Sequence, residues 1–299
     1  MRTFNWSTNL QQRARNIVRK CGLVGLNFIK NFKSAQFKYK EAESSKFISQ
    51  EVGKPSFLKN VGVISETYEG SGDYGIFLNN CRVSAWKFIV EKYSINTNSR
   101  LIDFGCSNGS WAKNWNTLGF SNVVGIDVNP KVIHEARDRL GTAEQGDADY
   151  VVKNFSSIET IAVNGVFVHI LEEEQVVKTL ANLASSLSGS GYCIFSVLNS
   201  SYYITPEGFK PWTGPNSCTR TLDYHRTCCA KAGLEIIGMV GSFINPWFTE
   251  STVYIANDAN LKSDLRTYSS MEVFANVLRE HEQLDPFSEV YFITRKIKA

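Results

Sequence analysis

The segment LIDFGCSNGS at residues 101–110 has the composition of a ligand-binding turn. An apolar run leads to the carboxylate of Asp103, and the chain then passes through Gly105 and Gly109. Glycine lets the backbone bend sharply and lets a ligand approach it closely, because it has no Cβ. Ligands of open α/β sheets bind where parallel strands end at their carboxyl edge. The segment therefore predicts a strand, a ligand-binding turn and a helix.

Two further carboxylates follow at the ends of the next elements. Asp127 ends the apolar run VVGID, where a carboxylate can accept hydrogen bonds from both hydroxyls of a ribose. Asp147 stands in the sequence GDA and could accept a hydrogen bond from an adenine amino group. Each has a structural alternative, since Asp127 could simply cap the helix that follows. Together, and in this order, they predict a nucleoside cofactor.

The spacing of the glycines distinguishes between nucleoside cofactors. The dinucleotide fingerprint G-x-G-x-x-G receives a pyrophosphate at a helix N-terminus. Here Ser107 replaces the middle glycine, and Asp103 stands just before the turn. A carboxylate there repels a pyrophosphate, whereas it suits a cofactor that carries an ammonium and a sulfonium.

Alternating strands and helices must position these residues. The apolar pattern predicts strands at 100–104, 122–127, 163–170, 191–198, 234–243 and 288–297. It predicts helices at 79–93, around Trp111 and Trp115, at 129–140 after an Asn129-Pro130 cap, at 172–187 and at 219–232. Because several of these strands are apolar on both faces, we expect an α/β protein with a mostly parallel sheet.

In order and spacing, the chain resembles the class I S-adenosylmethionine (SAM)-dependent methyltransferases. The segments that carry the resemblance are LIDFGCSNG, VVGIDVNP, GDA, GVFVHI and GSGYCIFSVLN. The closest likeness is to the small-molecule branch with a D-x-G-x-x-x-G first motif, over residues 95–200 and more loosely over 60–95 and 200–299. It implies a Rossmann-like fold with a seven-stranded, mostly parallel sheet, the last strand antiparallel and helices on both faces. It also implies SAM as cofactor.

The resemblance assigns the cofactor contacts by position. The loop from Asp103 to Gly109 would hold the methionine part, Asp127 the ribose, and Asp147 with Ala148 the adenine. Tyr74 or Tyr68 would close over the cofactor. The implied cofactor-binding set is Asp103, Phe104, Gly105, Cys106, Ser107, Gly109, Asp127, Val128, Asp147, Ala148 and Tyr74. Serine at 107 departs from the family's usual glycine and leaves the conformation of the loop open.

The acceptor side is defined by fewer residues. His169 follows the fourth-strand motif and is the first candidate for a general base, which a hydroxyl acceptor usually needs. His225 is the second candidate, and a structural histidine is the alternative for both. The candidates for acceptor binding are Tyr202, Tyr203 and Trp212 in an aromatic loop at about 200–216, and Trp247 in an insert at about 245–285. A purely structural loop is the alternative there.

The predicted function is methyl transfer to a small molecule, more to a hydroxyl than to an amine. The expected acceptor is sugar-containing, lipid-linked or a secondary metabolite. The alternatives are an N-methyltransferase of a small amine, a nucleic-acid methyltransferase and a non-catalytic SAM-binding module. An Asn/Asp-Pro-Pro-Tyr sequence after the expected fourth strand is absent, and so is the Lys-Asp-Lys-Glu set of RNA ribose methyltransferases. Both absences disfavour a nucleic-acid substrate.

Composition places the chain among ordinary globular proteins, with 43% apolar and 20% charged residues. The sequence has no apolar run of the roughly 18–20 residues that a membrane span needs. Seven scattered cysteines, an odd number, fit reduced thiols in a cytosol-like compartment. A zinc site of Cys218, His225, Cys228 and Cys229 is disfavoured because three of them share one predicted helix, so we expect no metal.

Charge is distributed unevenly along the chain. Residues 1–40 contain nine Lys or Arg and no acid, so the remainder carries a balance of −6 despite a total of +3. We expect a basic amphipathic extension at 1–60 and a catalytic domain at 61–299. The extension could be a helical cap, an arm on an anionic membrane or a mitochondrial targeting segment. The expected location is cytoplasmic, peripheral at a membrane in the second case and the mitochondrial matrix in the third.

Overall fold

A computed structural model describes residues 72–199, 204–205, 208–209, 218–244, 268–280, 282, 284 and 287–297. The predicted extension at 1–60 lies outside these residues, so the proposed domain boundary stays a prediction. Among the described residues, no helix is both long and apolar enough to cross a membrane.

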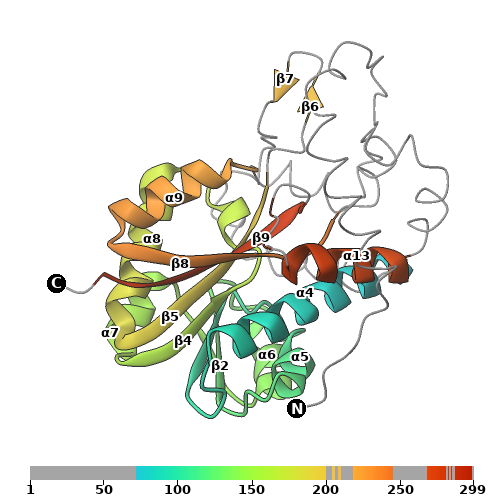
Figure 1. Ribbon diagram of the computed structural model, residues 1–299. Coiled ribbons are helices and arrows are strands. Elements are labelled where there is room, and N and C mark those ends of the chain that lie inside the picture. Colours follow the sequence, from blue (N-terminus) through green and yellow to red (C-terminus); the bar gives the residue numbers. More distant parts are fainter. Residues whose placement is uncertain are drawn as a thin grey trace, which may run out of the picture.

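A seven-stranded sheet forms the centre of the protein (Figure 1). Its strands are β1 Leu101–Phe104, β2 Val123–Asp127, β3 Ala143–Gln145, β4 Ile158–Val163, β5 Leu187–Leu198, β8 Leu234–Gly241 and β9 Glu289–Lys296. Their order is β3-β2-β1-β4-β5-β9-β8, and β9 runs antiparallel to both of its neighbours. This order confirms the predicted Rossmann-like fold with an antiparallel last strand.

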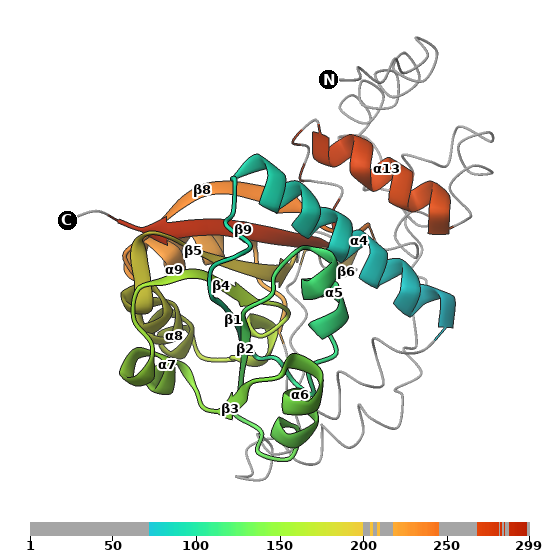
Figure 2. The ribbon, with the colours of Figure 1, turned by 90° about the horizontal axis from the view of Figure 1, so that it is seen from below.

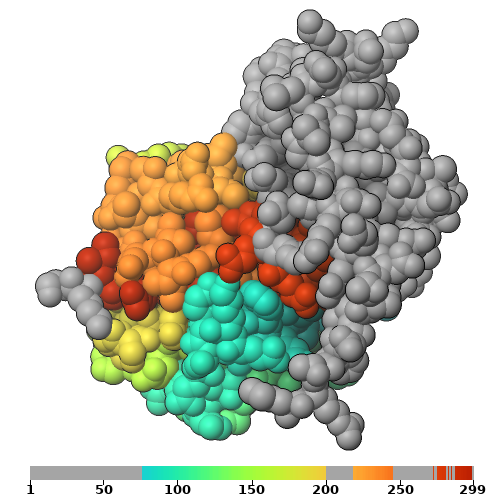
Figure 3. Space-filling model, viewed as in Figure 1, coloured from blue at the N-terminus to red at the C-terminus, as the bar shows by residue number. Residues whose placement is uncertain are grey.

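Helices cover both faces of the sheet (Figures 1 and 2). One face carries α4 Gly72–Lys92, α5 Ala112–Thr117 and α6 Ile133–Leu140. The other carries α7 Ala148–Asn154, α8 Glu173–Ser186 and α9 Leu222–Lys231. A further helix, α13 Tyr268–Glu280, lies along α4 in both views. In the space-filling view, the orange region of α9 and β8 adjoins the teal region of α4 (Figure 3).

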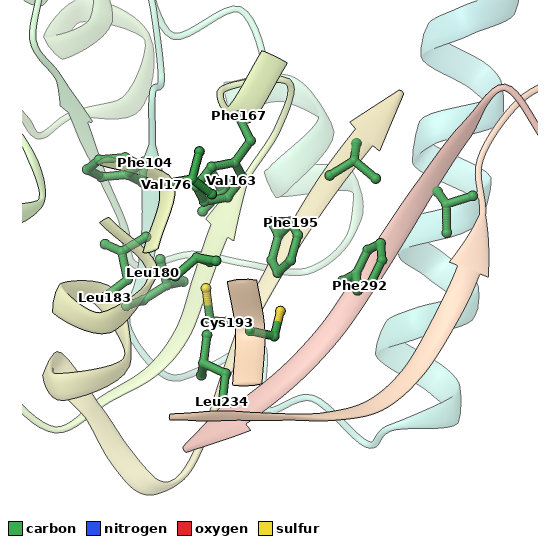
Figure 4. Packing of buried hydrophobic residues seen from close by; sticks show 14 of the residues in the cluster. Phe104, Val163, Phe167, Val176, Leu180, Leu183, Cys193, Phe195, Leu234 and Phe292 are labelled. Atoms are coloured by element: carbon green, nitrogen blue, oxygen red, sulfur yellow. The ribbon is translucent and has the colours of Figure 1, made fainter. Parts of the chain in front are cut away.

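Two apolar clusters hold these layers together. In the first, between the sheet and the layer of α8 and α9, the rings of Phe195 and Phe292 stack with their centroids 5.1 Å apart (Figure 4). In the second, under α4 and α5, the indoles of Trp86 and Trp115 meet edge to face at 4.9 Å. Such ring pairs add to the stability that burial of apolar area provides.

The predicted strand at 163–170 is wrong. The observed strand β4 ends at Val163, and Phe167–His169 form a short 3₁₀ helix, η1. Gly165 has φ +69°, which takes the chain out of the extended conformation. The apolar side chain of Phe167 is used in the core and not in a strand: its ring packs edge to face against that of Phe195, with the centroids 5.1 Å apart.

Smaller differences concern loops and one cap. The predicted cap at Asn129-Pro130 is a turn in which the Asn129 carboxamide oxygen accepts the Lys131 N–H, and the helix starts only at Ile133. Within the aromatic loop, two short strands pair, β6 Ile204–Thr205 and β7 Gly208–Phe209. The insert at 245–285 contains α13.

Candidate active site

The turn after β1 is bound to the end of β2. The N–H groups of Gly105 and Cys106 both donate to the Ile126 carbonyl, at 2.7 and 3.1 Å. Three residues of the turn have positive φ: Gly105 (+78°), Ser107 (+50°) and Gly109 (+77°). Ser107 therefore adopts the left-handed conformation that a glycine would take, so the serine at this position does not change the conformation of the turn.

Gly105 has a second reason to lack a side chain. A Cβ at this position would lie 2.2 Å from Cγ2 of Val166, in the segment that leads into η1. The turn after β1 and the loop after β4 are therefore in close contact. Any larger residue at 105 would push these two loops apart.

Asp127 is the buried carboxylate at the end of β2. Its Oδ2 accepts the Ser107 N–H and its Oδ1 accepts the Asn129 N–H, both at 2.8 Å. Burial raises the pKa of Asp127, while these backbone N–H groups favour the charged form. A carboxylate has about four acceptor positions, so two remain for the hydroxyls of a ribose.

The segment predicted to meet adenine is bound to the same residue. The Gly146 N–H donates to the main-chain carbonyl of Asp127 at 2.9 Å. Asp147 is exposed and caps α7, with Oδ1 accepting the Tyr150 N–H at 2.9 Å. Ala148 follows as a buried residue. The segments after three strands, β1, β2 and β3, thus meet at Asp127 and form what we call the cofactor cradle. Its one carboxylate for a ribose, that of Asp127, fits an adenosine-containing cofactor.

The other predicted cofactor residues lie around this cradle. Asp103 is 3% exposed and accepts the indole N–H of Trp115 at 2.9 Å. Phe104 and Cys106 are buried, and burial raises the pKa of the Cys106 thiol far above its usual range. The Val128 carbonyl accepts a long hydrogen bond from Gln145 at 3.4 Å. The backbone of Tyr74 lies in α4.

On the side toward β5, the segment after β4 carries His169. This half-buried residue ends η1, and its N–H donates to the Val166 carbonyl at 2.9 Å. Because Val166 packs on Gly105, η1 lies beside the turn that would hold the cofactor.

Arg220 fastens η1 from the side of α9. Its guanidinium donates to the carbonyls of Phe167 (3.3 Å), Ile170 (2.8 Å) and Leu171, and it lies 4.7 Å from the Tyr224 ring centroid. Close by, the Cys218 N–H donates to the Val168 carbonyl at 2.8 Å. The loop that carries His169 is thus fixed by a segment about fifty residues later in the chain.

The structure places His225 in the core, where it cannot exchange protons with groups that are open to solvent. This position does not suit a general base. It is 3% exposed, among the rings of Phe195, Tyr224 and Phe292. Burial lowers its pKa from 6.5 to about 3, and the charge of Arg220 acts in the same direction. It is therefore a neutral core residue at physiological pH.

The remaining predicted contacts cannot be placed. Tyr68, Tyr202, Tyr203, Trp212 and Trp247 lie outside the described residues. In the part of the chain that the structure describes, no three His, Cys, Asp or Glu side chains gather as metal ligands, and this part includes Cys218, His225, Cys228 and Cys229.

Two residues next to the site were not predicted from the sequence. They are Arg220, which binds η1, and Asn164, which directly follows β4. Asn164 falls inside the strand expected at 163–170, whereas the observed β4 ends at Val163, directly before it. Arg220 acts over a separation of about fifty residues, which no local pattern reveals.

Comparisons with known proteins agree with this geometry. A family model described as a methyltransferase domain matches residues 72–237, and no curated protein gives a match. An S-adenosylmethionine-dependent methyltransferase from Clostridium acetobutylicum ATCC 824 is 10% identical, with a TM-score of 0.53 over 81% of this chain and 99% of its own. A SAM-dependent methyltransferase from Archaeoglobus fulgidus is 16% identical, with a TM-score of 0.48 over 78% and 98%. At such identities the structural likeness concerns the fold.

Proposed function

The chain belongs to the class I SAM-dependent methyltransferases, and from this premise we propose that it methylates a hydroxyl group of a small molecule. SAM is the cofactor and supplies an electrophilic methyl group on a sulfonium. The proposed acceptor is sugar-containing, lipid-linked or a secondary metabolite.

The cradle around Asp127 supports a specific placement of the cofactor. Two acceptor positions on the Asp127 carboxylate suit the ribose hydroxyls, and the turn at 105–109 suits the methionine part. The segment Gly146–Ala148, bound to the Asp127 carbonyl, suits the adenine. With adenosine held at β2 and β3, the methyl group would lie on the side of β4 and β5, the strands next to η1.

The observation that carries the proposal is the contact between Gly105 and Val166. It places η1, and with it His169, beside the cofactor turn. A hydroxyl is a poor nucleophile until a base removes its proton, and histidine is the side chain that most often does so. Arg220 and Cys218 fix the loop, which keeps such a base in one position.

The test is turnover of a panel of hydroxyl and amine probes by the full chain with SAM. We would supply glycerol, methyl α-D-glucoside, 4-nitrophenol and ethanolamine, and measure S-adenosylhomocysteine and the methylated product by mass spectrometry. We expect methyl ethers, with a kcat that rises with pH and then levels off. His169→Gln should lower kcat by roughly 10²–10⁴-fold and flatten that profile.

His134→Gln is the matched control, because His134 is an exposed residue of α6. Methylation of ethanolamine alone, and on its nitrogen, would favour the amine alternative. A wild-type chain that binds SAM and methylates none of the probes would count against the proposed class of acceptor.

A further inference from the structure

Asn164 follows β4 directly, and only one of the two polar atoms of its carboxamide has a hydrogen-bond partner among the described residues. The Oδ1 atom accepts the indole N–H of Trp86 at 3.2 Å. The Nδ2 atom is buried and has no hydrogen-bond partner among the described residues. Buried amide groups are rarely left in this state, so a hydrogen-bond partner is expected for this one.

The orientation of this carboxamide is unambiguous. An indole N–H can only donate, so the atom that faces Trp86 must be the oxygen and the NH₂ group must be the unused end. Trp86 itself is fully buried and packs at 4.9 Å against Trp115, which makes the equivalent bond to Asp103. Two packed indoles thus hold the polar side chains at the carboxyl ends of β1 and β4.

The adjoining backbone is fixed as well. The Gly165 N–H donates to the hydroxyl of the buried Ser196, on β5, at 3.0 Å. The NH₂ group of Asn164 is therefore presented from a rigid part of the sheet edge, between β1 and β5. A donor on such a support can orient a ligand atom without paying for its own ordering.

We propose that Nδ2 of Asn164 donates a hydrogen bond to the acceptor oxygen that becomes methylated. This inference rests on the proposed function. The cofactor cradle is built at β1, β2 and the segment after β3, whereas Asn164 stands on the far side of β1 from β2. The position therefore suits the acceptor better than the adenosine or the ribose.

The division of roles in the reaction balances. One lone pair of the acceptor oxygen accepts a hydrogen bond from the Asn164 N–H. The hydroxyl proton of the acceptor passes to the imidazole of His169. The other lone pair forms the new C–O bond as the S–CH₃ bond breaks, which gives a methyl ether and S-adenosylhomocysteine. Asn164 orients the oxygen and transfers no proton itself, so its contribution comes from positioning.

The test combines two readouts on Asn164→Ala in the full chain. The affinity for SAM is measured by calorimetry, and kcat/KM by turnover of the best hydroxyl probe in the panel above. We expect the dissociation constant for SAM to stay within about threefold, and kcat/KM to fall roughly 10- to 100-fold. The Kd of the same probe for protein loaded with S-adenosylhomocysteine should rise, which is a readout independent of turnover.

Asn164→Asp provides a second variant with the same shape. It keeps an oxygen for the Trp86 N–H and replaces the NH₂ donor by a carboxylate oxygen, which also adds a negative charge, so it tests the loss of the donor even where the alanine variant folds poorly. Asn114→Ala is the matched control: Asn114 is also a half-buried asparagine under α4, and its amide is satisfied by Asn79 at 2.7 Å. We expect its kcat/KM to stay within twofold of the wild type.

The outcomes separate the two proposals. Normal kcat/KM in both Asn164 variants, with an active wild type, overturns the role of Asn164 and leaves the proposed function standing. A tenfold or greater loss of SAM affinity in the alanine variant assigns Asn164 to the cofactor and also overturns it. A wild type that methylates no hydroxyl probe overturns the proposed function and, with it, this contact.

Discussion

At the scale of single residues, Asp127 has an observed structural role beside its proposed role in binding the ribose. Its carboxylate accepts the N–H of Ser107, which has φ +50°, and so holds the turn in a conformation that serine rarely adopts. Its main-chain carbonyl holds the adenine-side segment through Gly146. The proposed cofactor cradle is thus organised around this residue.

We expect Asp127→Ala to abolish most of the affinity for SAM. The change removes two charge-assisted hydrogen bonds to the ribose and releases the turn, which corresponds to a loss of roughly 100-fold or more. Calorimetric titration with SAM and S-adenosylhomocysteine measures it directly. Asp223→Ala, at an exposed position of α9, is the control and should bind SAM normally. Unchanged affinity in Asp127→Ala would remove this residue from the site.

His225 should make the protein sensitive to mild acid. Its pKa is about 3 in the folded protein and 6.5 for an ordinary histidine, so the unfolded chain binds the proton more readily. The stability is therefore fully present above pH 6.5 and decreases as the pH falls toward 3. At pH 5 the loss is about 2 kcal/mol.

The measurement is urea unfolding at pH 7 and pH 5. His225→Phe should reduce the difference between the two pH values, because a phenyl ring can join the rings of Phe195 and Phe292 without a titrating group. His134→Phe, on an exposed part of α6, should leave the difference unchanged. An identical pH dependence in wild type and His225→Phe would show that other groups cause it.

At the scale of elements, α13 is held to the sheet by one buried guanidinium. Arg279 is 5% exposed and donates to the carbonyls of Gly241 and Ser242, at 2.8 and 2.9 Å. It also donates to Ser84 on α4 at 3.2 Å and to Asn276. Burial lowers its pKa from 12.5 to about 10, yet it stays charged at neutral pH.

We expect Arg279→Lys to destabilise the protein by about 2–4 kcal/mol, because an ammonium cannot reach the acceptors that a planar guanidinium reaches. Urea unfolding gives the free energy, and hydrogen exchange should show faster exchange in α13 than in β1. The comparison variant is Arg226→Lys on α9, an exposed residue of an i,i+3 ion pair, which should change stability by less than about 0.5 kcal/mol. Equal effects of both variants would contradict the anchoring role.

The elements that the sequence predicts well are those with an apolar run ended by a distinctive residue. β1 and β2 end close to Asp103 and Asp127, and the acids of Glu173 and Glu174 mark the start of α8 correctly. The prediction of β4 is wrong because Glu159 interrupts the apolar run of the true strand, while the later apolar residues around Phe167 belong to η1. Asn164 was therefore expected inside a strand, whereas it directly follows the end of β4.

The tertiary part of the site was beyond local patterns. The carboxylate of Asp127 and the turn at 105–109 could be predicted because both belong to one motif. The bonds of Trp86 to Asn164 and of Arg220 to η1 join residues 78 and about fifty positions apart. Only the packing of α4 and α9 on the two faces of the sheet creates them.

At the scale of the whole molecule, the most uneven feature of the sequence is the basic charge of residues 1–40, which lie outside the described residues. Nine cations and no acid lie in residues 1–40. One of the three predicted roles of this extension, attachment to an anionic membrane surface, would suit a lipid-linked acceptor. Attraction to such a surface amounts to about 1 kcal/mol per cation near it.

Replacing Arg13, Arg15, Arg19 and Lys20 by Gln in the full chain should reduce its co-sedimentation with vesicles that contain phosphatidylserine. The fraction bound by the wild type should also fall with rising salt, since the attraction is screened. Neutral phosphatidylcholine vesicles are the control. Equal sedimentation of wild type and variant at low salt would exclude membrane attachment through these cations.

The antiparallel position of β9 also matters for how the chain is completed. β8 comes earlier in the sequence, yet it has no partner strand until β9 is inserted between it and β5. During synthesis, everything up to β8 therefore emerges while β5 still has an unpaired edge, and such edges invite pairing with other chains. A nascent chain stopped before Glu289 would leave that edge of β5 exposed, so the sheet can close only after β9 has been synthesised.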